Sequence, residues 1–303
     1  MVRLASRRIV RRIRKSPFVR LFDKTPQGVI CPHFYELILS NGCPFRCSYC
    51  YLKLTFRGRK DPVLFVNPWR RVREEIEAVP QGVFSTGELA DSLAIIPPLL
   101  PRALDYFSTQ ETRTLLLVTK SANVGILLGR QASPSVIVSF SVNNERVHQL
   151  YEHATPPPSV RLEAARVLKS KGWRVRIRID PIILENGCED YRELCHRVAE
   201  LEPEMVTVGT LRQYPGLHNF SPDAPRDGLK RAPDGRLRYP ATIRIETYQR
   251  IAEWLGFQPA LCKETADVWR SLGWSFSGCN CTEGWGCGRE QLTQGHMGAR
   301  ATH

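Results

Sequence analysis

The sequence predicts an α/β protein whose parallel sheet curls into a barrel with a polar interior. Six strand-like runs alternate with helix-like runs, which is the order typical of a parallel α/β fold. The strand expected over 174–180 alternates charged residues with valine and isoleucine, and its charged face carries Arg174, Arg176, Arg178 and Asp180. A doubly wound sheet would be continuously apolar there, so a polar-lumen barrel accounts better for the alternation. A solvent-exposed edge strand remains the alternative.

The individual elements follow in a regular order along the chain. Apolar runs predict strands over 35–39, 82–86, 114–120, 135–141, 174–180 and 205–210. Amphipathic stretches with helical spacing predict helices between them, over 68–78, 99–106, 123–130, 158–171 and 191–201. Ser139 and Ser141 give the fourth strand a polar face similar to that of the fifth, in agreement with a polar lumen.

The composition changes after the sixth strand. Residues 214–240 are rich in Pro, Gly, Asp and Arg and predict a loop or linker, followed by a helix over 243–255. The remainder, from 261 onwards, is short and rich in Cys and Gly, like an appended module. We therefore expect three parts: a basic N-terminal arm (1–30), the barrel (31–214) and a C-terminal extension with a Cys-rich tail (215–303).

The composition is that of a folded protein, since 42% of the 303 residues are hydrophobic and 24% are charged. No apolar run approaches the roughly 20 residues of a membrane span, and the N-terminus lacks a signal-peptide core. We therefore expect a cytoplasmic protein with no membrane partner. Ten cysteines are unusual in that reducing compartment, where clustered cysteines more often hold metal or do chemistry than form disulfides.

The net charge of +13 is concentrated at the N-terminus. Before Phe22 there is no acidic residue, and the basic residues are Arg3, Arg7, Arg8, Arg11, Arg12, Arg14, Lys15 and Arg20. Such a block suits a phosphate backbone, which makes DNA or another nucleic acid the expected partner. A solvated tail is an equally simple explanation, and an organellar transit peptide is a weaker one.

A cysteine motif follows the first strand directly. Cys43, Cys47 and Cys50 have the spacing Cys-x3-Cys-x2-Cys, which lets three thiolates converge on one metal centre. Iron–sulfur clusters are normally held by four cysteines, so a triad leaves one iron open to another ligand. Zinc is the alternative, with Cys31 or His33 as a fourth ligand.

This loop, with the aromatic Tyr49 before its last cysteine and six strand and helix repeats after it, resembles the radical S-adenosylmethionine (SAM) superfamily. The resemblance implies a partial (βα)6 TIM-type barrel and a [4Fe–4S] cluster on Cys43, Cys47 and Cys50. It further implies that SAM binds the fourth iron and is cleaved to a 5′-deoxyadenosyl radical that abstracts hydrogen from the substrate. A reductant such as flavodoxin or ferredoxin would supply the electron.

Further motifs narrow the resemblance to spore photoproduct lyase and its wider relatives. They lie at 49–52 (Tyr-Cys-Tyr-Leu), 84–93 (Phe-Ser-Thr-Gly-Glu-Leu-Ala-Asp-Ser-Leu), 118–120, 138–143, 161–165 and 180–183, and they occur in that family's order. This resemblance covers about residues 31–212. It implies a carbon–carbon lyase that repairs a pyrimidine photoproduct in DNA.

The resemblance also implies which residues contact SAM. The loop of Ser85, Thr86, Gly87 and Glu88 is similar to the Gly-Gly-Glu element whose backbone and acid hold the SAM ammonium. Lys120 matches a position that contacts the SAM carboxylate or ribose, and so do the serines of the fourth strand, Ser139 and Ser141. For Lys120 the alternative is a strand-end lysine that extends into water.

Two tyrosines and one further cysteine are candidates for catalysis. Tyr49 and Tyr51 flank the last cluster cysteine and could pack on adenine, relay a hydrogen atom, or simply pack. The family's hydrogen-donating cysteine after the second strand is missing, because residues 83–94 contain no Cys. Cys188, just beyond the fifth strand, could replace it at the barrel mouth, although an inert loop thiol is the simpler interpretation.

A second cysteine group lies near the C-terminus. Cys262, Cys279, Cys281 and Cys287 are sufficient for a second metal or cluster, and neighbouring glycines would let the backbone turn around it. A mixture of buried and free thiols is equally consistent with the spacing.

Three functions are therefore open. The first is photoproduct repair, with the basic arm and Arg174, Arg176 and Arg178 meeting phosphates. The second is the same radical chemistry on RNA, a peptide or a small metabolite, which the missing donor cysteine favours. The third is a zinc-containing nucleic-acid-binding protein without catalysis.

Overall fold

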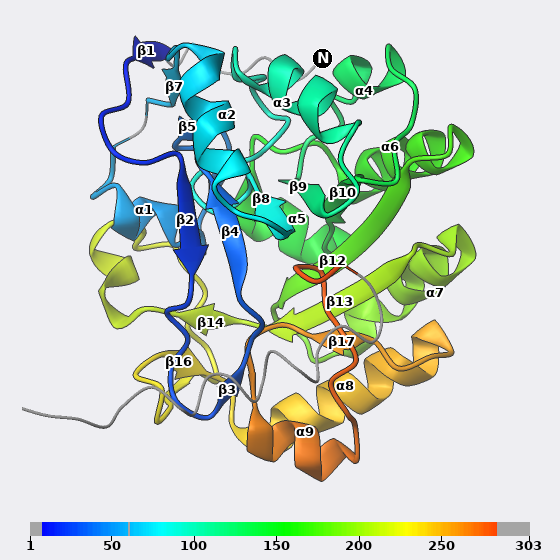
Figure 1. Cartoon of the computed structure of the whole chain (residues 1–303). Helices are drawn as coiled ribbons and strands as arrows, with labels where there is room; N and C mark the ends of the chain where they lie inside the picture. The colour runs from blue at the N-terminus through cyan, green and yellow to red at the C-terminus, as the bar shows by residue number, and fades with distance from the viewer. Residues whose placement is uncertain (1–7, 60, 284–303) are drawn as a thin grey trace, which may run out of the picture.

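The computed structural model describes residues 8–59 and 61–283, and an eight-stranded curled sheet forms its centre (Figure 1). In spatial order the strands are β17 (Ala260–Leu261), β13 (Met205–Thr210), β12 (Arg174–Ile182), β10 (Val136–Ser141), β9 (Arg113–Thr119), β8 (Gly82–Ser85), β4 (Phe34–Leu37) and β2 (Val19–Phe22). All neighbours are parallel except β2, which runs antiparallel to β4 at one edge. The partial barrel and all six expected strands are confirmed, with ends shifted by at most two residues.

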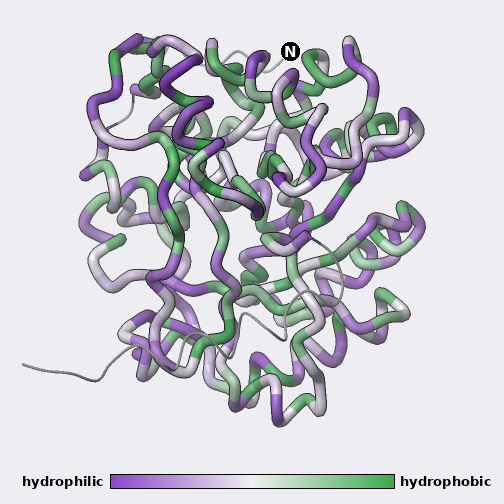
Figure 2. Tube along the Cα trace, viewed as in Figure 1, coloured by the Kyte–Doolittle hydropathy of each residue, from purple (hydrophilic) through white to green (hydrophobic). Residues whose placement is uncertain are grey.

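Helices connect the parallel strands and pack on the outside of the sheet (Figure 1). The longer ones are α2 (Trp69–Glu77), α3 (Leu100–Phe107), α5 (Glu145–Tyr151), α6 (Pro158–Ser170), α7 (Arg192–Leu201), α8 (Ala241–Leu255) and α9 (Ala266–Leu272). Short turns are α1 (Leu52–Thr55), α4 (Gly125–Leu128) and the 3-10 helices η1 (Glu189–Tyr191) and η2 (Pro215–Asn219). Five of the six helices expected from the sequence are confirmed, while the one expected over 123–130 is reduced to the single turn α4. Along α6, α7 and α8, hydrophobic and hydrophilic residues alternate, so each helix has one face for the core (Figure 2).

Four small sheets of two or three short strands complete the described part of the fold. They are β1 (Val10–Arg12) and β5 (Ser40–Asn41) on either side of β7 (Val63–Phe65), β6 (Arg46–Cys47) with β11 (Glu152–His153), β14 (Arg212–Gln213) and β15 (Lys230–Arg231) on either side of β16 (Leu237–Arg238), and β3 (Val29–Ile30) with β18 (Glu264–Thr265). The region expected to be a loop or linker over 214–240 therefore contributes strands and a helical turn. The arm is also ordered where the structure describes it, because β1 and β2 pair with β7 and β4. This excludes a frayed tail over residues 10–22.

The two faces of the sheet have different cores. In β9 and β10 the outward residues Leu115, Leu117, Val138 and Phe140 join the large core beneath the helices. The inward residues Phe34, Val83, Leu116 and Ile137 form a second, smaller core inside the curl, against which Cys281 packs. The C-terminal segment around Cys281 thus fills part of the space inside the curled sheet.

The charged face of β12 points into the lumen as expected, but only its end is open. Arg176 is fully buried and donates to the carbonyl oxygens of Asn280 (2.9 Å) and Thr282 (2.6 Å). Arg174 pairs with Glu204 at 2.6 Å and with Glu283 at 3.0 Å. The expectation that these two arginines meet phosphates is wrong, because the C-terminal segment already occupies their donors.

Arg178 and Asp180 lie further along β12 and line the remaining cavity.

In the part of the chain that the structure describes, no helix is both long and apolar enough to span a membrane.

Candidate active site

A cavity of about 1120 Å³ opens at the carboxyl ends of the parallel strands. Ligand sites of α/β barrels form at this end, because the loops that follow the strands converge there. Fifteen of the residues singled out from the sequence line the cavity: Cys31, Cys43, Cys47, Tyr49, Cys50, Tyr51, Gly87, Glu88, Lys120, Ser141, Arg178, Asp180, Cys262, Cys279 and Cys281. Nine basic residues line the cavity against five acidic ones. The cavity therefore suits a ligand that is both large and anionic.

The cysteine loop is fixed by backbone contacts on two sides. Its strand β6 pairs with β11, so that Cys47 lies opposite Glu152, and the Ser48 amide donates to the Tyr151 carbonyl at 2.8 Å. On the other side the Ser221 hydroxyl donates to the Ser48 carbonyl at 2.6 Å. The extension after the barrel therefore takes part in holding the loop.

The three thiols of the loop differ from a closed zinc site in the number of ligands they offer. Burial raises the pKa of Cys43, and the neighbouring Asp91, Cys50 and Cys47 raise it further, so all three cysteines lie close enough to interact. Among the described residues, no group of three or more His, Cys, Asp or Glu could hold a single metal ion. Closed zinc sites take four protein ligands, whereas three cysteines suit a [4Fe–4S] cluster that leaves one iron open to another ligand, so the chemistry of this donor set fits a cluster better than zinc.

Glu152 is the central anchor beneath this loop, and its side chain is fully buried. Its carboxylate lies 3.2 Å from the Lys120 ammonium and 2.6 Å from the Arg161 guanidinium, and it accepts a hydrogen bond from the Tyr49 hydroxyl. Burial alone would raise the pKa of Glu152, but Lys120 and Arg161 outweigh it and lower the pKa to about 2. Lys120 also lies over the Tyr49 ring, 5.7 Å from its centroid, so it does not extend into water.

The loop after β8 is pinned to the end of β9 by Asp91. This carboxylate accepts from the amides of Leu93 (3.0 Å), Ala94 (2.8 Å) and Lys120 (2.6 Å) and from the Thr119 hydroxyl (2.7 Å). A side chain at position 87 would not fit, because a Cβ on Gly87 would come within 2.4 Å of the Val118 Cβ. The loop therefore needs glycine there to lie against β9.

The other members of that loop have different positions. Glu88 is half-buried at the cavity wall, and its carbonyl accepts from the Tyr51 hydroxyl. Ser85 and Thr86 do not line the cavity: the Ser85 hydroxyl accepts from the Gly87 amide at 3.3 Å, and the Thr86 hydroxyl lies 2.7 Å from that of Ser92. Both shape the loop from behind, so backbone rather than these side chains faces the cavity.

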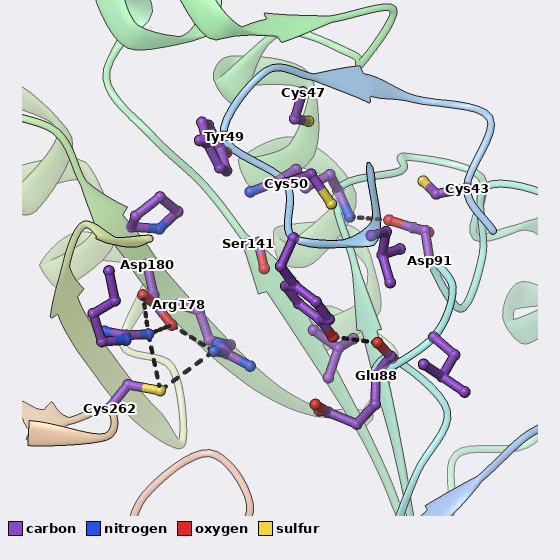
Figure 3. Close-up of a pocket in the computed structure, with 18 of the residues that line it drawn as sticks. Cys43, Cys47, Tyr49, Cys50, Glu88, Asp91, Ser141, Arg178, Asp180 and Cys262 are labelled. Atoms are coloured by element: carbon purple, nitrogen blue, oxygen red, sulfur yellow. Dashed lines mark hydrogen bonds and ion pairs between the residues drawn. The ribbon is translucent and has the colours of Figure 1, made fainter. Parts of the chain in front are cut away.

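A second polar group lies on β12 and its neighbours (Figure 3). Asp180 accepts from Arg178 at 2.6 Å and from Arg212 at 2.8 Å, and both guanidinium groups reach the Cys262 sulfur, at 3.5 and 3.6 Å. Burial would raise the pKa of Asp180, but the two arginines lower it to about 2. Asp180 is therefore a carboxylate held between two cations.

Two further predicted residues, besides Ser85 and Thr86, lie outside the cavity. Ser139 is fully buried in β10, two residues before Ser141. Cys188 is half-buried at the start of η1, beside Glu189 and Arg250. The expectation that Cys188 lies at the barrel mouth is wrong, because the chain turns away from the mouth after β12 and carries it toward α8.

The C-terminal cysteines do not form one group. Cys279 and Cys281 contact each other, whereas Cys262 contacts the arginines. Cys287 lies outside the described residues. The three described members do not gather into a single metal site.

Sequence reasoning assigned no role to Glu152, Asp91, Arg161 or Arg212, although Asp91 and Arg161 lie in the motifs at 84–93 and 161–165. Arg161 did carry a signal, because it shares one face of α6 with Ala165 and Leu168, and an arginine on an apolar face needs a buried carboxylate. Glu152 carried none, since β11 is only two residues long.

Comparison with known proteins agrees with this geometry. The family model described as spore photoproduct lyase matches residues 31–251, which is most of the chain. The chain belongs to the spore photoproduct lyase family. Spore photoproduct lyase of Clostridium acetobutylicum is 28% identical over 67% of this chain and 62% of its own length. That of Bacillus subtilis is 28% identical over 57% of this chain and 53% of its own length. The chain thus spans less than two thirds of these curated members.

The fold of the family is shared as well. A solved spore photoproduct lyase, complexed with dinucleoside spore photoproduct, superposes with a TM-score of 0.70, at 20% identity and over 84% of this chain and 81% of that one. The match confirms the half-barrel fold. It extends beyond 31–214, so part of the C-terminal extension also belongs to the common architecture.

Proposed function

We propose that the chain is a radical SAM enzyme that repairs a pyrimidine photoproduct in DNA. The observation that carries the proposal is the cavity wall at the mouth of the barrel, where Cys43, Cys47 and Cys50 lie with Lys120 and Glu88. Cys43, Cys47 and Cys50 would hold a [4Fe–4S] cluster there, and the cluster with SAM would supply the radical chemistry that removes a hydrogen atom from the substrate.

The chain's own residues hold and orient these groups. Lys120 presents its ammonium beside the cluster loop and is fixed by Glu152, so it offers a positioned cation for the SAM carboxylate. Glu88 offers a half-buried carboxylate for the SAM ammonium, and Ser141 a hydroxyl for its ribose. Tyr51 lines the cavity and fixes the Glu88 backbone through the hydrogen bond from its hydroxyl. Enclosure of this kind keeps water from a reactive intermediate.

The proposed substrate class rests on the charge and volume of the cavity and on a solved member of the same family. A solved family member was captured with bound AdoMet and dinucleoside spore photoproduct. The cavity here exceeds the upper end of ordinary pockets, about 1,000 Å³, and its excess of basic residues suits a phosphate-bearing ligand. A lesion in a duplex would have to leave the stack to enter it.

A smaller hollow supports a longer strand as the substrate. It measures about 290 Å³, lies beside β1 and is lined by the exposed cations Arg12, Lys15 and Arg59. It shares Gly42, Phe56 and Arg59 with the main cavity, so the two adjoin. Cations beside an aromatic ring suit a nucleic-acid strand that leaves the reacting site.

The experiment is incubation of the reconstituted protein with UV-irradiated DNA, SAM and dithionite, followed by chromatography of the digested DNA. Restored thymine, dependent on SAM, is the expected result. Abundant 5′-deoxyadenosine without restored thymine would reject this substrate and leave RNA, a peptide or a small metabolite. A colourless protein that holds only zinc would reject both enzyme functions. Flavodoxin or ferredoxin can then replace dithionite to test the proposed reductant.

A further inference from the structure

The wall opposite the cysteine loop contains an incompletely neutralised pair of arginines. Asp180 is buried and accepts from both Arg178 and Arg212, with its side chain only 6% exposed. The arrangement is tight, because a Cβ on Gly209 would come within 2.5 Å of Arg212 Nη1 and 2.9 Å of Asp180 Oδ1. A glycine at 209 is therefore required for the pair to pack as it does.

Asp180 and the two arginines together carry a net positive charge, and one of their hydrogen-bond donors has no partner among the described residues. Two guanidinium groups share one carboxylate, so one positive charge has no partner within the trio. Arg178 Nε is buried without a hydrogen-bond partner among the described residues. Two further cations, Arg236 and Lys263, line the same cavity. An excess of positive charge at the wall of a cavity points to an anion that arrives with a ligand.

We propose that Arg178 and Arg212, positioned by Asp180, bind the phosphodiester that links the two nucleosides of the lesion. This rests on the proposed function and names the group of the substrate that the wall recognises. Arginine suits the task because its planar fork donates to two phosphate oxygens at once.

The position of the wall separates this role from cofactor binding. Figure 3 shows Arg178, Asp180 and Cys262 grouped on one side of the cavity, away from Cys43, Cys50 and Asp91. The SAM carboxylate could also supply anionic oxygens, but Lys120 already lies beside the cysteine loop. The wall is thus free for the substrate.

The test compares two probes that differ only in the phosphate. One is the dinucleotide spore photoproduct with its bridging phosphodiester, and the other is the dinucleoside, which lacks it. Their affinities, and that of SAM, are measured by calorimetry on the reconstituted wild-type protein and on Arg178→Gln. We expect the variant to bind the dinucleotide at least tenfold more weakly, since it loses charge-assisted hydrogen bonds to the phosphate. Its affinity for the dinucleoside and for SAM is expected to stay within twofold.

Two further variants complete the test. Lys24→Gln removes an exposed cation from the same cavity. It should lower the affinities for the two probes equally and only slightly. Arg178→Lys keeps the charge without the fork and should lose affinity for the dinucleotide alone, which keeps the test valid if Arg178→Gln does not fold.

The outcomes are distinct. Equal loss for both probes in the arginine variants, or no loss for either, overturns the inference while the proposed function stands. A loss of SAM affinity alone assigns the wall to the cofactor and likewise overturns it. If neither probe binds the wild-type protein, the proposed function and this inference both fail.

Discussion

Glu152 lies directly opposite Cys47 in the antiparallel pairing of β11 with β6. The same carboxylate contacts Lys120 at the end of β9 and Arg161 on α6. One buried side chain therefore connects the cysteine loop with the sheet and with a covering helix. The position of the cysteine loop depends on this connection.

Glu152→Gln should destabilise the protein by about 3–5 kcal/mol, because removing one partner of a buried ion pair leaves uncompensated charge on Lys120 and Arg161. Urea unfolding measures the change in the free energy of unfolding. Glu163→Gln is the matched control, since its pair with Arg166 on α6 is exposed and worth about 0–1 kcal/mol. Equal effects of the two substitutions would remove Glu152 from its central role.

The same carboxylate should make stability depend on acid. Its pKa of about 2 lies below the ordinary value of 4.5, so its contribution is complete above about pH 5 and is lost as the pH falls toward 2. The loss is on the order of 3 kcal/mol. Unfolding measured from pH 6 to pH 2 should show a steeper fall for wild type than for Glu152→Gln. Parallel curves would contradict the assignment.

How much the sequence predicts depends on whether a feature is local. The period of two in β12 and the helical spacing of α6 are local patterns, so the barrel and its elements follow from them. Besides Glu204, the partners of Arg174 and Arg176 lie about a hundred residues away in the C-terminal segment, and no local pattern indicates them.

The candidate site divides in the same way. The cysteine triad is a short motif, and the structure brings its members to one cavity as expected. Cys188 was misplaced because a position just after a strand does not say which way the chain turns. Glu152 was missed because its strand pairing joins positions 105 residues apart through two residues each.

Cys47→Ser should abolish the broad absorption near about 400 nm that an iron–sulfur cluster gives after anaerobic reconstitution. Cys188→Ser is the control, because that thiol lies outside the cavity, and it should reconstitute like the wild-type protein. Iron and sulfide analysis measures how many iron and sulfide ions each variant holds per chain. Iron retained by the Cys47 variant at the wild-type level would place the cluster elsewhere.

The combined change Arg12→Ala, Lys15→Ala and Arg59→Ala should weaken binding of a single-stranded oligonucleotide. Each lost phosphate contact lowers the salt slope by about 0.7 on single strands, so the slope should fall by roughly 2. Fluorescence anisotropy over a series of salt concentrations measures it. Arg70→Ala with Arg73→Ala, on the exposed face of α2, is the control. An unchanged slope in the triple variant would exclude the smaller hollow as a strand path.

The most direct test of the central claim is formation of 5′-deoxyadenosine by the reconstituted protein with SAM and dithionite, measured by chromatography. The proposed function predicts steady formation in the wild-type protein and none in Cys47→Ser. No 5′-deoxyadenosine from a wild-type protein that carries its full complement of iron would contradict the account.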